Sequence, residues 1–510
     1  MQKAFASNYL KIYVWQGISF VLNVLSMVIV VPFLTKDPMV YGIYSVCISV
    51  TIFLAYADVG FISAGIKYAA ELYSRNDRLN EIKVIGFTNF VLLVFLILFS
   101  MLFLMLSFHP DYLIKDVNIE QGYSIASSLL LIVSIFTPVT LLNRMLQMIF
   151  GIRIEDYIMQ RVNIVTNIAK ISSVFYFFSS ESYDIVGYFL FCQSANLLAS
   201  LVSLTIAKRR YHYDMGLLFK SLRYDRIIFT QTRSLAFSSL YVAITWILYY
   251  ELDNVAIGKY YGAERVAVYA VSLTILSVFR NIFGILFSPF GARFNHFVGM
   301  KDYTGLKAFY FQIINYLAPV VVLPILTISL LARPMILSWV GINYSDSVLV
   351  TEILVLCNIF AFISYPAGLL LIAQLRIREM NVINSLIPFI YWFGIAFSIK
   401  YLGLVSFATF KFLAFAVAAV YYLRITKSFL GLNFRELFKK IFVPLVFPVL
   451  FVIFVSLVVR GFLPIEKSRF NLAMVLSAIS MIVFFGLTIQ LLSSTLWREK
   501  VFSILRSLKV

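Results

Sequence analysis

Residues 85–106 read IGFTNFVLLVFLILFSMLFLML, an apolar run of 22 residues that contains no charged side chain. A helix of about 20 apolar residues crosses the bilayer core of about 30 Å, so this run predicts a transmembrane helix. Comparable runs recur along all 510 residues of the chain, which is 61% hydrophobic and 13% charged. The sequence therefore predicts an all-α polytopic membrane protein.

About fourteen runs of this kind are bounded by charged residues, glycine or proline. Six of them form a first group, at Tyr13–Leu34, Val40–Ile62, Ile85–Leu106, Ser127–Phe150, Tyr157–Phe178 and Ile185–Ile206. Eight follow, at Leu235–Val255, Val266–Phe290, Ala308–Leu331, Val350–Ala373, Val382–Ile399, Leu404–Leu423, Ile441–Val459 and Phe470–Leu492. We expect a six-helix bundle in 1–207, a linker in 208–233, a second six-helix bundle in 234–425, and two additional helices with a tail in 426–510.

The formal net charge of +18 is distributed unevenly over the predicted loops. The two ends of the chain and the even-numbered loops carry roughly 30 of the 42 Lys and Arg residues, and the opposite loops carry about 9. The positive-inside rule then places both termini in the cytoplasm, and it accounts for the basic excess without nucleic acid as a partner. The linker contains the most basic loop, in which Lys220, Arg223 and Arg226 alternate with apolar residues. We expect this segment to lie along the inner membrane surface.

Cofactor and metal chemistry is not indicated by the residue pattern. The cysteines Cys47, Cys192 and Cys357 lie inside predicted spans and form no CxxC pair, and the three histidines fall in separate loops. A GxxxxGK[ST] phosphate loop is also missing from the sequence. We therefore expect no metal, no cofactor and no catalytic residue.

Two short segments indicate an internal repeat. Tyr41–Val46 (YGIYSV), at the start of the second predicted span, is echoed by Val266–Val271 (VAVYAV) at the start of the eighth. An offset of six spans returns the chain to the same side of the membrane, so the halves would be parallel repeats with a cavity between the two bundles. Prolines within the spans predict kinked helices that suit bending, at Pro32, Pro138, Pro319, Pro324, Pro366, Pro388, Pro444 and Pro448.

Cations inside predicted spans are candidates for substrate binding, because a charge in the bilayer costs several kcal/mol unless it faces water, a partner or a ligand. Lys170, Arg280 and Lys411 lie within spans, and Arg144 lies near an inner end where its side chain can reach the membrane surface. These cations would line an electropositive cavity that favours an anionic substrate, for which phosphate is the natural group. The alternative for each is an ion pair between helices.

Three acidic residues near the ends of spans are candidates for ion coupling or gating: Asp58, Glu251 and Asp253. Each could carry a proton, pair with one of the cations, or serve as a structural cap. The residues leave H⁺ and Na⁺ equally open as the coupling ion.

Two segments resemble the Wzx-type polysaccharide flippases of the multidrug/oligosaccharidyl-lipid/polysaccharide exporter superfamily. The first is Tyr56–Phe61 (YADVGF) running into Gly65–Glu71 (GIKYAAE), and the second is Leu252–Gly258 (LDNVAIG) followed by Tyr261–Tyr269 (YGAERVAVY). Tyr365–Gly368 with Arg376, and Gly403, match more loosely. The similarity extends over nearly the whole chain in length and span count, although each motif is short.

This resemblance implies a flippase that moves an undecaprenyl-diphosphate-linked oligosaccharide from the cytoplasmic to the periplasmic leaflet of a bacterial inner membrane. The repeat unit would serve O-antigen, the polysaccharide of lipopolysaccharide, or a related surface glycan. A polysaccharide polymerase and a chain-length regulator would be its partners, together with membrane lipid. The resemblance also implies a cationic central cavity, although Arg280, Lys170 and Lys411 match no fixed family motif.

Three other functions compete with this interpretation. A lipid II flippase and a drug/cation antiporter belong to the same superfamily. A membrane polymerase or ligase would carry a large external loop with functional Arg or carboxylates, whereas the longest external connection runs only from about Ser107 to Ala126. A purely structural scaffold is disfavoured because charges inside the membrane would then bring only a cost.

Overall fold

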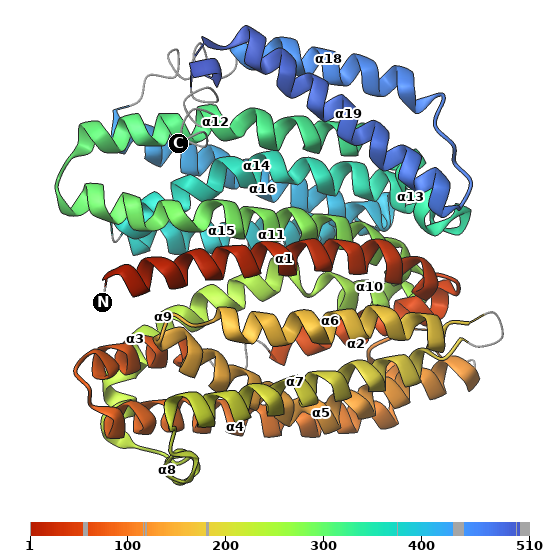
Figure 1. The fold of residues 1–510 in the computed structure, drawn as a ribbon. Coiled ribbons are helices and arrows are strands. Elements are labelled where there is room, and N and C mark those ends of the chain that lie inside the picture. The colour runs from red at the N-terminus through yellow and green to blue at the C-terminus, as the bar shows by residue number, and fades with distance from the viewer. Residues whose placement is uncertain are drawn as a thin grey trace. The chain divides into compact units, whose positions relative to one another are not determined.

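The computed structural model describes residues 2–54, 60–115, 117, 120–179, 183–374, 376–431, 443–495 and 497–499. All regular structure in these residues is helical, as the sequence predicted (Figure 1). The described residues form two compact units, Met1–Ala270 and Val271–Val510, here called unit 1 and unit 2. The division falls within one long helix, α11 (Ala263–Gly299).

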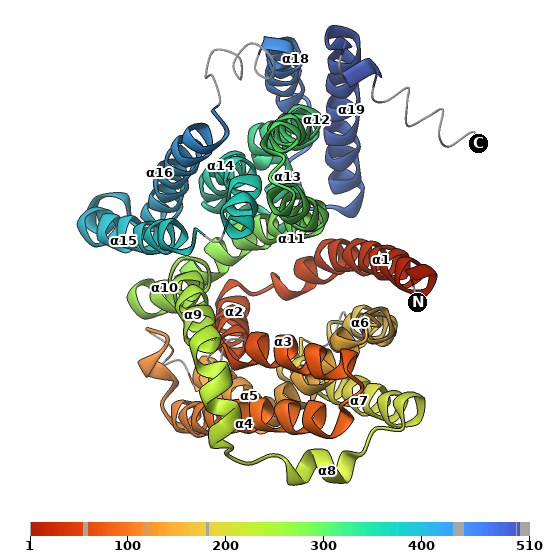
Figure 2. The same cartoon turned by 90° about the vertical axis from the view of Figure 1, so that its left-hand side faces the viewer.

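Unit 1 begins with ten helices that precede α11. They are α1 (Gln2–Leu34), α2 (Pro38–Phe53), α3 (Phe61–Ser74), α4 (Arg78–Phe108), α5 (Glu120–Ile152), α6 (Tyr157–Phe177), α7 (Ile185–Tyr211), α8 (Met215–Lys220), α9 (Arg226–Tyr250) and α10 (Asp253–Tyr261), with a 3-10 turn η2 (Pro110–Tyr112). Within this unit, α4 packs along α5 and α6 lies between α1 and α7 (Figures 1 and 2).

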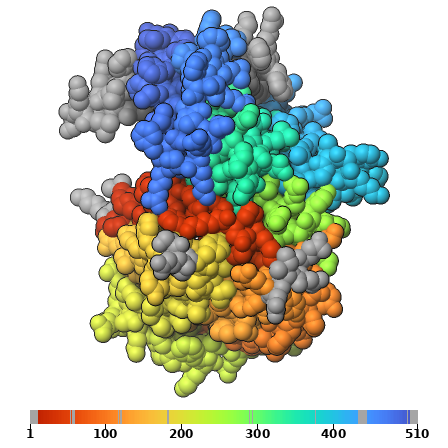
Figure 3. Space-filling view, turned by 90° about the vertical axis from the view of Figure 1, so that its right-hand side faces the viewer, coloured from red at the N-terminus to blue at the C-terminus, as the bar shows by residue number. Residues whose placement is uncertain are grey.

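Unit 2 contains the remainder of α11 and a set of helices built around α12, α14 and α16. They are α12 (Tyr303–Leu330), α13 (Ala332–Val340), α14 (Ser347–Ala373), α15 (Ile377–Leu402), α16 (Val405–Leu430), α18 (Val443–Arg460) and α19 (Arg469–Ser493), with a 3-10 turn η3 (Ile342–Tyr344). The last two helices pack on α12 and on each other. Their side chains form much of the surface of unit 2 on the face drawn in Figure 3.

Eleven described helices are long and apolar enough to cross a membrane, or twelve if the bent pair α9 and α10 is one span. These helices establish a multi-pass membrane protein. Two further predicted spans also fold as helices but fall outside that set, because α2 has only 16 residues and α6 is interrupted by polar side chains. The fourteen predicted spans thus each contain a described helix, and eleven or twelve of them are long and apolar enough to cross a membrane.

Aspartate side chains begin many of these helices. The Asp37, Asp77, Asp184, Asp214, Asp225 and Asp302 carboxylates each accept a hydrogen bond from a backbone N–H in the first turn of the helix that follows. The first N–H groups of a helix lack partners within it, and a capping side chain supplies one. Much of the small acidic content of the chain is therefore committed to helix starts.

One described pair of helices that together could form a span is broken: α9 and α10 meet at 42°, at Glu251 and Leu252. The surrounding sequence contains no proline, so the cause predicted for kinks does not apply here. Most of the prolines predicted to lie within spans lie inside continuous helices such as α12, which contains both Pro319 and Pro324.

Candidate functional site

Lys170 lies in the middle of α6 and turns its ammonium group toward α7. The Lys170 Nζ donates a hydrogen bond of 2.6 Å to Oδ1 of Asn196. Within the described part of the chain, Lys170 takes part in no ion pair. A positive charge in a bundle of apolar helices is thus held by a neutral amide, which leaves it available to an anion.

Further polar side chains surround Asn196. The Asn196 Nδ2 lies 3.4 Å from Oε1 of Gln193, and the Ser200 hydroxyl donates to Oδ1 of Asn143 at 2.8 Å. Ser200 also donates to the Asn196 carbonyl. These contacts join α5 and α7 through amides and a hydroxyl, in the interior of unit 1.

A cavity of about 200 Å³ opens beside these residues. Its polar lining consists of Thr51, Thr137, Thr140, Asn143, Gln193 and Asn196. None of the described residues that line it is charged. Amides and hydroxyls both donate and accept hydrogen bonds, so such a lining suits sugar hydroxyls, while the nearby ammonium suits a phosphate.

Polar contacts also connect α6 to α1. Asn167 Nδ2 donates to Oδ1 of Asn23 at 3.3 Å, and the Arg161 guanidinium lies 4.6 Å from the Trp15 ring centroid. A lipid-facing surface would not favour these groups. The polar side chains of α6, which keep it out of the set of apolar spans, therefore partly contact the neighbouring helices.

The candidate cations of unit 2 lie in different surroundings. Arg280 is partly buried in α11, close enough to Tyr365 to interact with its hydroxyl electrostatically, and Tyr365 stacks on Phe287 with ring centroids 5.6 Å apart. Lys411 in α16 is only 1% exposed, and its Nζ lies 5.2 Å from the Tyr391 ring centroid. Arg280 is thus the more accessible of the two.

Arg144 and the acidic candidates lie in unit 1, apart from Asp58, which is outside the described residues. Arg144 donates to Oε1 of Gln147, one turn further along α5, at 3.0 Å. Glu251 follows the last residue of α9 and is 7% exposed. Asp253 opens α10 and is fully buried.

Hydrogen bonds explain the sequence around the bend of α9 and α10. The Tyr269 hydroxyl donates to Oδ2 of Asp253 at 2.7 Å, which joins α11 to α10. The Asn254 Nδ2 donates to the Ser49 hydroxyl at 2.9 Å, which joins α10 to α2. The Leu252–Tyr269 stretch is therefore a packing junction of unit 1, built around a buried carboxylate.

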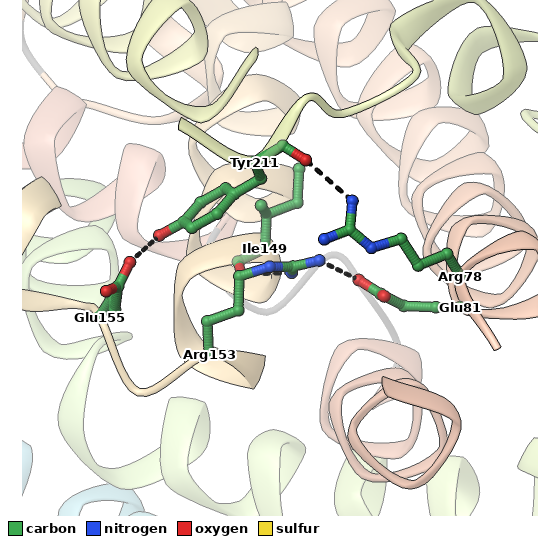
Figure 4. Close-up of polar contacts among 6 residues, drawn as sticks. All are labelled: Arg78, Glu81, Ile149, Arg153, Glu155 and Tyr211. Atoms are coloured by element: carbon green, nitrogen blue, oxygen red, sulfur yellow. Dashed lines mark hydrogen bonds and ion pairs between the residues drawn. The ribbon is translucent and has the colours of Figure 1, made fainter. Parts of the chain in front are cut away.

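A buried ion pair in unit 1 was not singled out by the sequence. At the end where α4 begins and α5 ends, Nη2 of Arg153 lies 2.7 Å from Oε1 of Glu81, and both side chains are almost completely buried (Figure 4). The Arg153 guanidinium also donates to the Ile149 carbonyl at 2.9 Å. The rings of Tyr73 and Tyr211 lie 4.7 and 4.8 Å from it.

A second ion pair lies next to the first. Arg210 donates to both carboxylate oxygens of Glu155. The Tyr211 hydroxyl donates to the same carboxylate (Figure 4). The hydrogen bonds from Arg210 and Tyr211 lower the pKa of Glu155, whereas burial raises the pKa of its neighbour Asp156. Arg78 donates to the Tyr211 carbonyl at 2.9 Å, so the ends of α4, α5 and α7 are tied together.

The chain has a polytopic helical fold that is similar to those of solved transporters of the MOP superfamily. The solved structure of the lipid II flippase MurJ in an inward closed conformation has a TM-score of 0.69 at 12% identity, covering 94% of this chain and 98% of that chain. The structure of an inward-facing MATE multidrug resistance transporter has a TM-score of 0.61 at 16% identity, and the match covers 82% of this chain and 95% of that chain. The structure of a MOP superfamily transporter from Pyrococcus furiosus has a TM-score of 0.52 at 14% identity, and the match covers 84% of this chain and 96% of that chain.

Comparisons of the sequence with protein families and with curated proteins do not assign the chain to a family. No family model matches the chain, and no curated protein matches it. The similarity to solved structures agrees with the superfamily that the sequence motifs indicated, and at these identities it establishes the fold alone.

Proposed function

We propose that the protein is a flippase for an undecaprenyl-diphosphate-linked oligosaccharide, destined for O-antigen or a related surface polysaccharide. The observation that carries the proposal is Lys170, an ammonium inside the helices of unit 1 that binds the neutral Asn196. Asn196 lines a cavity together with two further amides, three threonine hydroxyls and four apolar side chains. That chemistry suits a diphosphate and its attached sugars. A drug cation would instead be repelled by the ammonium.

In this proposal the substrate crosses by alternating access. Two six-helix bundles with boundaries near 1–207 and 234–425 would move about a shared cavity, and the helices within 426–510 would shape a lateral opening for the prenyl tail. Arg280, Lys411 and Arg144 would add positive charge along the route. A proton or Na⁺ would reset the transporter through Asp253, Glu251 or Asp58.

The proposed location is the bacterial inner membrane, with both termini in the cytoplasm as the loop charges predict. A polymerase and a chain-length regulator would receive the exported units. No covalent chemistry on the substrate is required of this chain, so it would act as a transporter and not as an enzyme.

Two solved neighbours support the direction of the proposal. MurJ is named a lipid II flippase, and its structure covers 94% of this chain. The Pyrococcus furiosus structure is described as having a binding pocket of reverse polarity that suggests a different function within the superfamily. A lipid II flippase is the second candidate, favoured by the nearly full-length overlap with MurJ.

The test is export in cells that lack the gene and carry a plasmid copy. Wild type should restore surface glycan, whereas Lys170→Gln should leave single lipid-linked units on the cytoplasmic face at a normal protein level. Lys67→Gln, which removes an exposed ammonium of α3, is the matched control and should restore export. Lipid-linked units that reach the periplasmic face but stay unpolymerised would indicate a polymerase, and accumulation of lipid II would indicate the second candidate.

A further inference from the structure

The short helix α8 and the residues after it occupy a distinctive place in unit 1. Figure 2 views the unit's long helices close to end-on, and α8 lies outside α4 and crosswise to them. Ser221, which follows α8, packs so closely on α4 that a Cβ at Gly86 would lie 2.5 Å from the Ser221 Cβ. Leu218 is completely buried. The segment is therefore fixed at the rim of the bundle.

The length of α4 sets the depth of this contact. Its 31 residues span about 46 Å, about 16 Å more than the hydrocarbon core. Gly86 lies about 12 Å from the beginning of α4, as eight residues of helical rise separate it from Arg78. With the excess length shared between the two ends, α8 lies close to the boundary between lipid headgroups and acyl chains.

The outward side chains of the segment alternate between apolar and basic. Phe219, Tyr224 and Ile227 are 54%, 57% and 71% exposed. Between them lie the exposed cations Lys220, Arg223 and Arg226. Among the described residues none of these three cations has an ion-pair or hydrogen-bond partner for its charged group. Leu218, one of the apolar residues of the segment, is buried against the protein and takes no part in this outward pattern.

Ring contacts hold the second half of the segment in place. The ring centroid of Tyr224 lies 6.2 Å from that of Phe87 in α4 and 5.9 Å from that of Phe229. The Phe229 ring stacks on Phe61, with centroids 5.9 Å apart. Tyr224 is thus held against α4 on one side and exposed on the other. The pattern of cations and apolar side chains is preorganised and does not need to fold on binding.

We propose that residues 215–227 form a binding site for anionic phospholipid headgroups, here called the α8 platform. Phe219, Tyr224 and Ile227 would insert at the boundary of the acyl chains, and Lys220, Arg223 and Arg226 would bind lipid phosphates. Charge complementarity selects the occupant, because three cations without acidic partners at headgroup depth favour an anionic lipid over a zwitterionic one. The site is independent of the transported substrate.

Hydrogen exchange of the purified full chain in vesicles tests this site. Amides of residues 215–227 should exchange at least about fivefold more slowly in vesicles with phosphatidylglycerol than in phosphatidylcholine alone, since fivefold is the factor that one of the three basic residues contributes at an anionic surface. Replacing the three cations together (Lys220→Gln, Arg223→Gln and Arg226→Gln) should abolish the difference. The matched variant Lys115→Gln, Lys259→Gln and Arg265→Gln removes equal charge from other exposed positions of unit 1 and should retain it.

Equal exchange rates in the two kinds of vesicle would overturn the proposal, as would a rate difference that survives loss of the three cations. A second measurement guards against misfolding of the variant. Native mass spectrometry should show that wild type retains phosphatidylglycerol in preference to phosphatidylcholine and that the triple variant has lost this preference. Exchange elsewhere in unit 1 should be unchanged between the two proteins.

Discussion

Gly42 of α2 lies against the Ala263 carbonyl at the start of α11 so closely that a Cβ on residue 42 would be 1.8 Å from the oxygen. Gly42 belongs to the first copy of the sequence repeat, and Ala263 lies just before the second. The first segment therefore meets the backbone of the residue that begins α11, three residues before the second segment.

A methyl group at this contact should be costly. Gly42→Ala should destabilise the protein by about 1–3 kcal/mol, because backbone atoms cannot yield as a flexible side chain can. Thermal unfolding in detergent measures the change. Gly17→Ala in α1 is the control, since nothing lies within 4 Å of its added Cβ and alanine is favoured over glycine in a helix by roughly 0.5–1 kcal/mol. Equal melting temperatures for Gly42→Ala and wild type would contradict the close contact.

The buried pair of Glu81 and Arg153 should show strong coupling. Arg153→Met leaves the Glu81 carboxylate buried without its partner and should cost about 3–5 kcal/mol. The double variant with Glu81→Gln should recover part of that loss, which a double-mutant cycle on unfolding free energies would measure. Arg210→Gln removes the half-exposed cation of the neighbouring pair and should cost no more than about 1 kcal/mol. Similar losses for the two arginines would contradict the assigned burial.

Glu155 and Asp156 should respond to pH with opposite signs. Glu155 has a lowered pKa in the folded protein. Its contribution to the free energy of unfolding is therefore present above the unfolded pKa of about 4.3, and it is lost as pH falls through the folded pKa. Asp156 has a raised pKa, so its charged form opposes folding above that pKa and the opposition fades on acidification. On acidification from pH 7 to pH 3, the melting temperature should therefore fall less steeply for Glu155→Gln than for wild type.

The companion substitution Asp156→Asn should raise the melting temperature at pH 7 and bring it toward that of wild type in acid. Its direction is opposite to that of Glu155→Gln, which should lower the melting temperature at pH 7. If both variants shifted the curve in the same direction, the two environments assigned here would be wrong.

Substitution of Asp253 can distinguish a role in ion coupling from a purely structural role. Asp253→Asn keeps an acceptor for the Tyr269 hydroxyl, so the protein should fold with a nearly unchanged melting temperature. Its transport, measured in vesicles with an imposed pH gradient, should no longer respond to the gradient. Tyr269→Phe is the matched change that removes the donor and keeps the carboxylate, and it should retain the response. A full response in Asp253→Asn would remove this residue from the coupling mechanism.

The helices could be predicted from the sequence because each apolar run is long and contiguous. Each predicted span contains a described helix, although the end of the second span and the first two residues of the thirteenth lie outside the described part. The seventh span, Leu235–Val255, continues from α9 across the break into α10. The break between α9 and α10 could not be predicted in the same way. It depends on contacts such as Asp253 with Tyr269, whose partners become adjacent only in the fold.

The polar sites were predicted less completely. Lys170 stood out because a charge is rare in an apolar run, but Asn143, Gln193 and Asn196 are neutral and gave no such signal. Arg153 and Glu81 looked like ordinary loop charges, since the sequence does not show which loops meet. Burial of a charge near a helix end is a tertiary property, and pairing across 72 residues of sequence leaves no local pattern.

The absence of proline from the α9–α10 break has a mechanical consequence. A proline ring fixes a kink by covalent geometry, whereas this angle is held by exchangeable bonds from Tyr269 to Asp253 and from Asn254 to Ser49. Neither hydrogen bond imposes a constraint of that covalent kind on the angle between the two helices. The joint between α9 and α10 in unit 1 is thus free of covalent stiffening, and side-chain contacts tie it to α2 and α11.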